Sequence, residues 1–168
     1  MNERSWRWLT CWLRPQFWAV ASYRVERAVH LASGPTWPIV RLASRPLFGV
    51  IRPGTVDIDC RAQLGPGLMI AHPALGVVVS CHASIGARAM LTGGNCIGVT
   101  QRFQAGDRLR IGDDVNLGAN AVVLGPISLG DRVSVGAGAV ATRDAPDDAV
   151  VRLPASTVHI RGEDSERH

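Results

Sequence analysis

The feature that most constrains this 168-residue chain is a series of aliphatic residues spaced six apart between about residues 58 and 141. The series slips by three residues after Ile70 and is interrupted again by the longer segment 99–110. Glycine often follows each aliphatic residue, and a small or branched residue often stands two positions before it. The aliphatic positions are Ile58, Leu64, Ile70, Val79, Ile85, Leu91, Ile97, Ile111, Leu117, Val123, Leu129, Val135 and Ala141.

A period of six matches neither the helical period nor the two-residue alternation of a plain strand. It fits a short strand, a tight turn and another short strand, and glycine eases the turn because it tolerates positive φ. Three such strands make a triangular coil of about 18 residues, and coils stack by parallel pairing at about 4.8 Å per rung. The aliphatic side chains then fill the interior. The sequence therefore predicts an all-β solenoid, a parallel β-helix, because a linker rich in glycine and alanine would not keep this spacing.

The segments that flank the repeats are predicted to differ from them. Apolar residues at spacings of three and four predict a helix over about Pro15–Ala32, which Gly34-Pro35 ends. A second helix, kinked or split at its proline, is expected over Trp37–Gly49. We therefore divide the chain into an N-terminal helical segment at 1–52, a β-helix at 53–145, and a C-terminal extension with a polar tail at 146–168.

Composition excludes several classes of protein. A net charge of +4 without a dense basic run does not indicate a nucleic-acid-binding protein. No apolar run reaches the ~18 residues of a transmembrane helix. The four cysteines lack CxxC spacing and follow no secretory signal, which indicates reduced thiols in a cytoplasmic protein. The tryptophan-rich N-terminus could pack on the prism, on a neighbouring subunit, or peripherally on a membrane surface.

Chemistry is expected where the repeat is interrupted, because loops on a regular scaffold carry function. His72 follows the third aliphatic residue of the first coil, and Asp57 precedes the first one. In a three-sided coil these two corners lie one above the other, so we expect both residues at one corner, about one rung apart. A carboxylate there can orient the imidazole and leave its other nitrogen to take a proton. A surface histidine beside an unrelated aspartate fits the spacing equally well.

The other histidines and the cysteines are weaker candidates for a catalytic or metal-binding role. His82 lies at a regular turn position, which is typical of a surface residue. Only His72 and His82 fall within the repeats, so no metal site is expected. Cys60 and Cys81 occupy equivalent turn positions on successive coils, and we interpret them as neighbouring but unreactive thiols. No residues are arranged as a distinctive covalent nucleophile with its base.

Four motifs give the chain a family resemblance: VDI at Val56–Ile58, LGPGLMIAHP at Leu64–Pro73, the repeats at Ile111–Val140, and RDAP at Arg143–Pro146. On these motifs, over about residues 14–154, the chain resembles the hexapeptide-repeat acyltransferases, which fold as left-handed β-helices. It looks most like the serine O-acetyltransferase-like branch, which includes enzymes of capsule and exopolysaccharide gene clusters. In that branch the histidine of G-L-x-I-x-H is the general base and the aspartate of V-D-I orients it. The resemblance thus assigns these roles to His72 and Asp57.

The same resemblance implies acetyl-CoA as the donor and a homotrimer in which the pantetheine arm lies between neighbouring prisms. Backbone groups of two Gly-Ala turns, stacked one coil apart, would hold the arm, and an arginine just past the last repeat would lie near the CoA phosphates. The repeat turn alone would also account for these glycines. The implied cofactor-binding residues are Gly98, Gly118, Ala119, Gly136, Ala137 and Arg143.

The chain departs from serine acetyltransferases at positions that bear on the acceptor. An aspartate precedes the histidine in those enzymes, where this chain has Ala71, and Asp107 and Arg108 stand nearest to their Arg-His pair. Arg152 replaces a glycine of their exit segment. We therefore predict an O-acetyltransferase that acts on a hydroxyl of a small molecule or sugar. The alternatives are a serine O-acetyltransferase proper, a catalytically silent β-helix that serves in binding or assembly, and a zinc-dependent hydratase.

Overall fold

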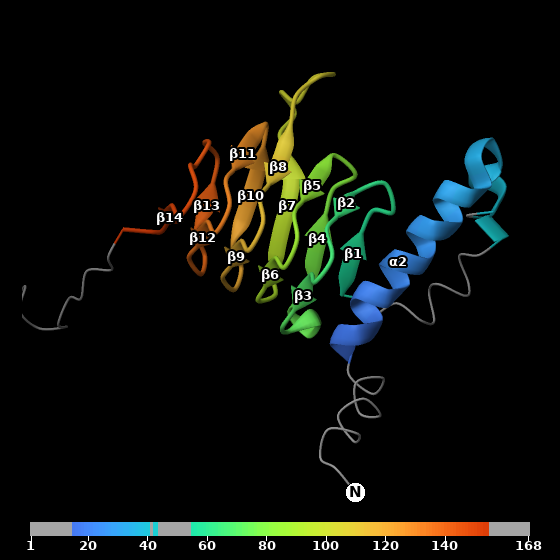
Figure 1. Cartoon of the computed structure of the whole chain (residues 1–168), viewed down its shortest axis with the longest axis horizontal. Coiled ribbons are helices and arrows are strands. Elements are labelled where there is room, and N and C mark those ends of the chain that lie inside the picture. The colour runs from blue at the N-terminus through green and yellow to red at the C-terminus, as the bar shows by residue number, and fades with distance from the viewer. Residues whose placement is uncertain (1–14, 41, 44–54, 155–168) are drawn as a thin grey trace, which may run out of the picture.

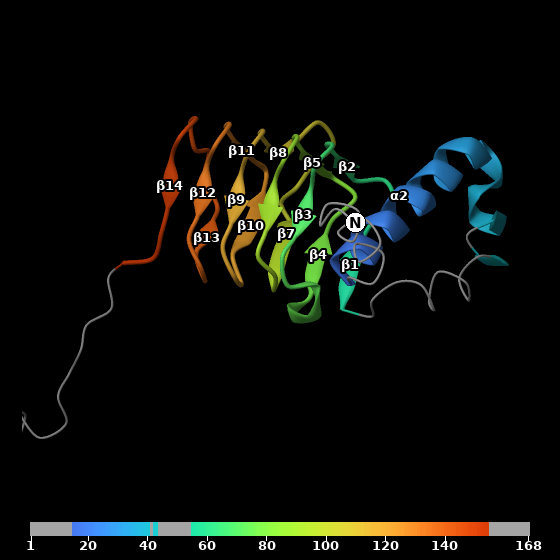
Figure 2. The same cartoon turned by 60° about the horizontal axis from the view of Figure 1, so that its bottom comes forward.

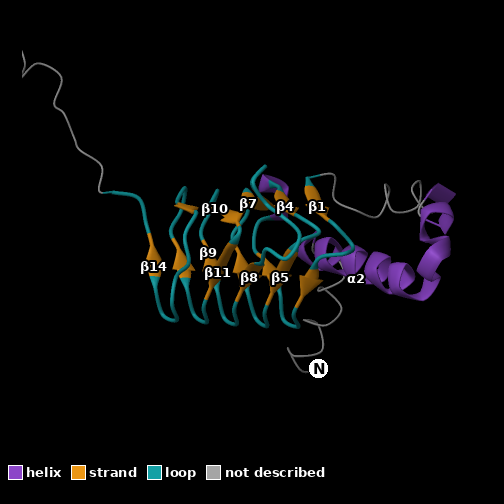
Figure 3. Cartoon of the chain, turned by 90° about the horizontal axis from the view of Figure 1, so that it is seen from above, coloured by secondary structure: helices purple, strands orange, loops and turns teal. Residues whose placement is uncertain are grey.

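The structure is a computed structural model that describes residues 15–40, 42–43 and 55–154. Three parallel sheets form a prism, and one long helix lies at the end where the first coil begins (Figures 1 and 2). Figure 3, seen from above, shows the coils following one another along the prism axis. The predicted left-handed parallel β-helix is confirmed.

From β1 to β13 the chain visits the three sheets in rotation, and every registered pair of strands is parallel. In the last coil a single bridge between Leu129 and Ala145 stands at the sheet B position before β14 joins sheet C. Sheet A contains β1 (Val56–Ile58), β4 (Val77–Val79), β7 (Asn95–Val99), β10 (Val122–Gly125) and β13 (Val140–Ala141). Sheet B contains β2 (Gln63–Leu64), β5 (Ala83–Ile85), β8 (Leu109–Ile111) and β11 (Ile127–Leu129). Sheet C contains β3 (Met69–Ile70), β6 (Met90–Leu91), β9 (Asn116–Leu117), β12 (Ser134–Val135) and β14 (Val150–Val151).

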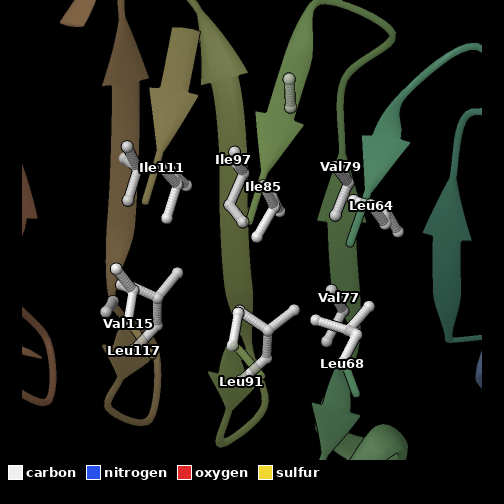
Figure 4. Packing of buried hydrophobic residues seen from close by; sticks show 14 of the residues in the cluster. Leu64, Leu68, Val77, Val79, Ile85, Leu91, Ile97, Ile111, Val115 and Leu117 are labelled. Atoms are coloured by element: carbon white, nitrogen blue, oxygen red, sulfur yellow. The ribbon is translucent and has the colours of Figure 1, made fainter. Parts of the chain in front are cut away.

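The interior of the prism is the core that the six-residue period predicts. Every aliphatic position of the series is buried, from Ile58 to Ala141. Figure 4 shows such side chains from different sheets, among them Leu91, Ile97 and Leu117, pointing into the same interior. Full burial of an aliphatic side chain stabilises the fold by about 1.5–3 kcal/mol, so the stacked rows are its main source of stability.

Both interruptions of the repeat are turns that leave the regular coil. After β3 the chain makes a short 3-10 helix, η2 (Pro73–Leu75), before β4 begins. Residues 100–108 connect β7 to β8, and this loop projects from the prism in Figure 1. The sequence correctly places both irregularities, and the prism continues undisturbed on either side of them.

Helix α2 (Pro15–Ser33) covers the open end of the first coil. N–H groups of that coil donate to the next one, as Asp59 does to the carbonyl oxygen of Val79, so the open end presents carbonyl oxygens. The helix supplies the donors: the Tyr23 hydroxyl donates to the Ala62 oxygen at 2.6 Å and Arg24 donates to the Leu64 oxygen at 2.6 Å. The helix is therefore a cap made by hydrogen bonds as well as by apolar contact.

The remaining predicted segments are described only in part. The 3-10 helix η1 (Gly34–Thr36) follows α2, and residues 37–40 and 42–43 are helical, while the rest of the predicted second helix lies outside the described residues. The tryptophan-rich N-terminus and the polar tail also lie outside them. Strand β14 pairs with β12 beyond the predicted domain boundary at residue 145, which stays a prediction. No described helix is long and apolar enough to cross a membrane.

Candidate active site

Four stacked turns lead from sheet C to sheet A, at residues 71–76, 92–94, 118–121 and 136–139, and we call this column the C–A edge. His72 lies in the first of these turns, and the Gly-Ala pairs at Gly118-Ala119 and Gly136-Ala137 lie in the third and fourth. Successive rungs are about 4.8 Å apart. The structure thus aligns the predicted base and the predicted pantetheine turns along one edge of the prism.

The backbone of His72 is fixed on both sides while its side chain is exposed. Its N–H donates to the Thr92 oxygen of the next turn at 2.9 Å, and its carbonyl oxygen accepts from Leu75 at 3.1 Å. The Thr55 hydroxyl donates to the Pro73 oxygen at 2.8 Å and so ties this turn to the start of β1. The imidazole is therefore accessible on a turn that is held from below and above.

Asp57 stands in the middle of β1 with its side chain outside the prism. It lies two residues after Thr55, and its register partner on β4 is Val78, just past the turn of His72. Asp57 thus lies on the outer face of sheet A, near the start of the strand that the turn of His72 precedes on the next rung, and a contact between the carboxylate and the imidazole stays a prediction. Asp57 also lines a cavity of about 270 Å³ that Cys60 and Cys81 share.

A buried polar side chain that sequence reasoning missed joins the turns of the C–A edge. Asn95 is only 1% exposed, and its Oδ1 accepts from the Gly93 N–H at 2.9 Å. Its Nδ2 donates to the carbonyl oxygens of Gly118 at 2.8 Å and Ala121 at 3.3 Å. A polar residue two positions before Ile97, where the other repeats carry an apolar residue, is the signal that could have revealed it.

Gly93 makes the next turn fit against the turn of His72. Its φ is +131°, a conformation that favours glycine. A Cβ at this position would stand 2.5 Å from the carbonyl oxygen of His72 and 3.1 Å from the Cβ of Leu75. The turn that carries His72 therefore depends on a residue without a side chain one rung above it.

The two predicted pantetheine turns are stacked in contact. The N–H of Gly138 donates to the Ala119 oxygen at 2.8 Å, and a Cβ on Gly118 would lie 2.6 Å from the nitrogen of Ala137. Ala119 is half-buried and Ala137 is exposed. Because the side chains here are only methyl groups, a ligand arm could approach the backbone closely.

The other predicted cofactor-binding residues lie apart from this edge. Gly98 lies within β7, paired with Leu124, rather than in a turn. Arg143 is exposed and follows β13, so it lies past the far end of the sheet A strands. The structure does not bring these two residues together with His72.

The projecting loop contacts the prism through an aromatic ring. Phe103 lies against the ring of His82, with centroids 4.8 Å apart. Asp107 accepts from the Gln104 N–H at 2.8 Å and so stabilises the loop itself. The loop is thus held in place by contacts that the six-residue period does not predict.

Comparison with known proteins supports the family that this geometry suggests. A family model described as the hexapeptide repeat of succinyl-transferase matches residues 108–143. The serine acetyltransferase of Synechococcus elongatus is 34% identical over 151 residues, which are 88% of this chain and 59% of that protein. A serine acetyltransferase of Helicobacter pylori is 34% identical over 141 residues, which are 83% of this chain and 78% of that protein.

Solved structures agree with these relatives. A crystal structure of Neisseria gonorrhoeae serine acetyltransferase superposes with a TM-score of 0.69 at 32% identity, over 84% of this chain and 55% of that one. A serine acetyltransferase in complex with CoA gives a TM-score of 0.71 at 28% identity, over 90% of this chain and 60% of that one. The chain thus spans less than two thirds of some of its relatives. The match with the Helicobacter enzyme, however, covers 78% of that protein at 34% identity. This chain therefore belongs to the serine acetyltransferase family of hexapeptide-repeat proteins.

Proposed function

We propose that this protein is an O-acetyltransferase that moves the acetyl group of acetyl-CoA to the hydroxyl of serine. The observation that carries the proposal is the alignment of exposed His72 with the stacked Gly-Ala turns along the C–A edge. The relatives support it, since several are serine acetyltransferases and one solved relative is a complex with CoA. These relatives favour serine as the acceptor over the small-molecule or sugar hydroxyl that we predicted from the differences between this sequence and serine acetyltransferases.

In the proposed reaction His72 removes the proton of the acceptor hydroxyl as the oxygen attacks the thioester carbonyl. Asp57 orients the imidazole and stabilises its protonated form. Backbone N–H groups near the C–A edge stabilise the negative charge on the carbonyl oxygen. The C–S bond then breaks, and protonated His72 gives its proton to the departing CoA sulfur, so that CoA leaves as the free thiol. The acetyl group passes directly from donor to acceptor, because no covalent nucleophile is assigned.

Acetyl-CoA would lie along the C–A edge, with its pantetheine arm against the Gly118-Ala119 and Gly136-Ala137 turns. The methyl side chains of Ala119 and Ala137 fit such an arm, since they leave the backbone within reach. Arg143 and Gly98 contribute to the donor site only if the ligand also crosses sheet A. The assignment of these two residues therefore rests on the family resemblance alone.

We also propose that the protein is a homotrimer that packs through sheet A. The outward row of sheet A is largely apolar, and Val78 and Val140 are each 48% exposed. The outward row of sheet B is polar, and that of sheet C is divided by Asn116 and Ser134 between exposed Met69 and Val150, so sheet A offers the most continuous apolar face among the described sheets. The registered outward rows are Asp57, Val78, Cys96, Val122 and Val140 on sheet A and Gln63, Ser84, Arg110 and Ser128 on sheet B.

A sugar or other small hydroxyl is a second candidate acceptor. Ala71, directly before His72, has no side chain that could hold the amino group of serine by charge. Its carbonyl oxygen is already engaged by the side-chain amide of Gln16 at 3.1 Å. An acceptor without an amino group would not need a charged side chain at Ala71.

The test is release of CoA thiol from acetyl-CoA with serine and with a panel of sugars as acceptors. His72→Ala should lower turnover with the preferred acceptor by roughly 10²–10⁴-fold, whereas His82→Ala should leave it within about twofold. Unchanged turnover of the His72 variant would refute the assigned base. A protein that binds no CoA in a thermal-shift assay would instead be the silent module.

A further inference from the structure

Cys60 and Cys81 lie next to each other at the corner between sheets A and B. Ile58 pairs with Val79 before the turn and Gln63 pairs with Ser84 after it, with the same register offset, so the two cysteines face one another across adjacent rungs. Stacked rungs separate their Cα atoms by about 4.8 Å, within the range that a disulfide spans. Both cysteines are reduced thiols in the structure.

The two thiols differ in access. Cys60 is only 4% exposed, beneath α2, whose Arg27 donates to the Cys60 carbonyl oxygen at 3.1 Å. Cys81 is half-buried, and both residues line the same cavity of about 270 Å³. A small reagent in solution therefore meets Cys81 first, with Cys60 behind it.

The groups around Cys81 suit a reactive thiol. Its Sγ lies 3.3 Å from Nδ1 of His82. Arg61 is held over the turn by Asp59, which accepts from its Nε at 3.0 Å. Its guanidinium pKa is raised mainly by the hydrogen bond and charge of Asp59, and further by the nearby Cys81 and Cys60. At this distance the imidazole nitrogen can take the thiol proton as the sulfur attacks an oxidant.

We propose that Cys81 and Cys60 form a redox-active pair that hydrogen peroxide converts to a disulfide. This reverses our interpretation of the two thiols as unreactive. A metal site is not the better explanation, since the described residues contain no group of three or more His, Cys, Asp or Glu that could hold one. The inference does not depend on the proposed acetyl transfer.

The reaction balances in two steps. The Cys81 thiolate attacks one peroxide oxygen, the O–O bond breaks, and after proton transfer Cys81 is a sulfenic acid and one water has formed. The Cys60 thiol then attacks the Cys81 sulfur, the S–S bond forms, and the S–O bond breaks with loss of a second water. Two thiols are oxidised by two electrons and the peroxide is reduced to two waters.

The test is peptide mapping of the full chain after treatment with hydrogen peroxide. Trypsin, which cleaves after arginine except before proline, places each cysteine on its own peptide, with Cys60 in 42–61, Cys81 in 62–88 and Cys96 in 89–102. The expected product is a cross-link between 42–61 and 62–88, lighter by two hydrogens than the separate peptides and cleaved by dithiothreitol. Cys96 is the matched control, since it is also half-buried but faces Val78 and Val122 across its rungs.

Two conservative variants keep the result interpretable. Cys81→Ser should abolish the cross-link and Cys96→Ser should leave it unchanged, and both should unfold at the wild-type temperature in reducing buffer. Absence of the cross-link, a cross-link that joins Cys81 to another cysteine, or oxidation that dithiothreitol does not reverse would each overturn the proposal.

Discussion

The side-chain amide of Asn95 donates a 2.8 Å hydrogen bond to the carbonyl oxygen of Gly118, one coil further along the edge that carries His72. The same side chain accepts from the N–H of Gly93, whose turn stacks on that of His72. One buried residue therefore links the turn of the proposed base to a turn of the proposed donor site. Changes at Asn95 should thus affect the geometry of the whole edge.

Asn95→Val should lower the free energy of unfolding by about 2 kcal/mol, because it leaves the buried N–H of Gly93 without an acceptor. The carbonyl oxygens lose less, since those of Gly118 and Ala121 also accept from backbone N–H groups. Urea unfolding at fixed protein concentration measures the change. Asn116→Val, on the exposed face of β9, is the control and should change it by less than about 0.5 kcal/mol.

Gly93→Ala should destabilise the protein more than Gly106→Ala. Both glycines have strongly positive φ, +131° and +103°, but a Cβ at Gly106 meets nothing within 4 Å whereas one at Gly93 meets the His72 oxygen at 2.5 Å. We expect a loss of about 1 kcal/mol at Gly106 and of at least about 2–3 kcal/mol at Gly93. Thermal unfolding of the two variants checks this. Equal losses would contradict the prediction, because they would mean that the close contact with the His72 oxygen costs no stability.

Asp57→Asn should lower kcat about 10–100-fold, because a neutral amide cannot stabilise the imidazolium of His72. If the carboxylate acts through the imidazole, the double variant with His72→Ala should be scarcely slower than His72→Ala alone. Steady-state rates of the four proteins complete this cycle. Fully additive effects would show that Asp57 acts independently of His72.

Ala119→Phe should weaken CoA binding at least about tenfold, since an aromatic ring in the Gly-Ala turn would keep the pantetheine arm from the backbone. Ala87→Phe is the matched control, because Ala87 is also half-buried in a Gly-Ala turn but lies on the edge between sheets B and C. Calorimetric titration with CoA distinguishes the two edges. Equal weakening by both variants would place the donor site elsewhere.

The surface pair of Arg132 and Asp148 should contribute to stability in a pH-dependent way. The hydrogen bond from Arg132 lowers the pKa of Asp148 below its ordinary value. Its stabilising contribution is therefore present above the ordinary carboxyl pKa and is lost as the pH falls through the lowered one. Asp148→Asn should have a slightly lower Tm than wild type near about pH 7 and the same Tm near about pH 2. A difference that persists in acid would mean that the charge is not its source.

The repeat in the sequence predicted most of this fold correctly. A six-residue period requires that residues such as Ile85 and Leu117 share one interior, and the two breaks in the period appear as η2 and the loop at 100–108. Asn95 could not be predicted in the same way. The hydrogen bonds that make a buried Asn95 favourable depend on carbonyl oxygens supplied by turns of another coil. A pattern of apolar residues carries no information about those partners.

In the candidate site, too, some features could be predicted from the sequence and others only from the structure. Local sequence singled out His72 and the Gly-Ala turns, since a break in the repeat and small residues are visible in the chain itself. Only the stacking of coils placed them along one edge, with Arg143 and Gly98 away from it. The surroundings of Cys81 likewise became visible only in three dimensions, because its contacts with His82 and Arg61 depend on how the turn packs. Period and turn chemistry are properties of neighbours in sequence, whereas edges, cavities and side-chain contacts arise from the rungs that the tertiary structure brings together.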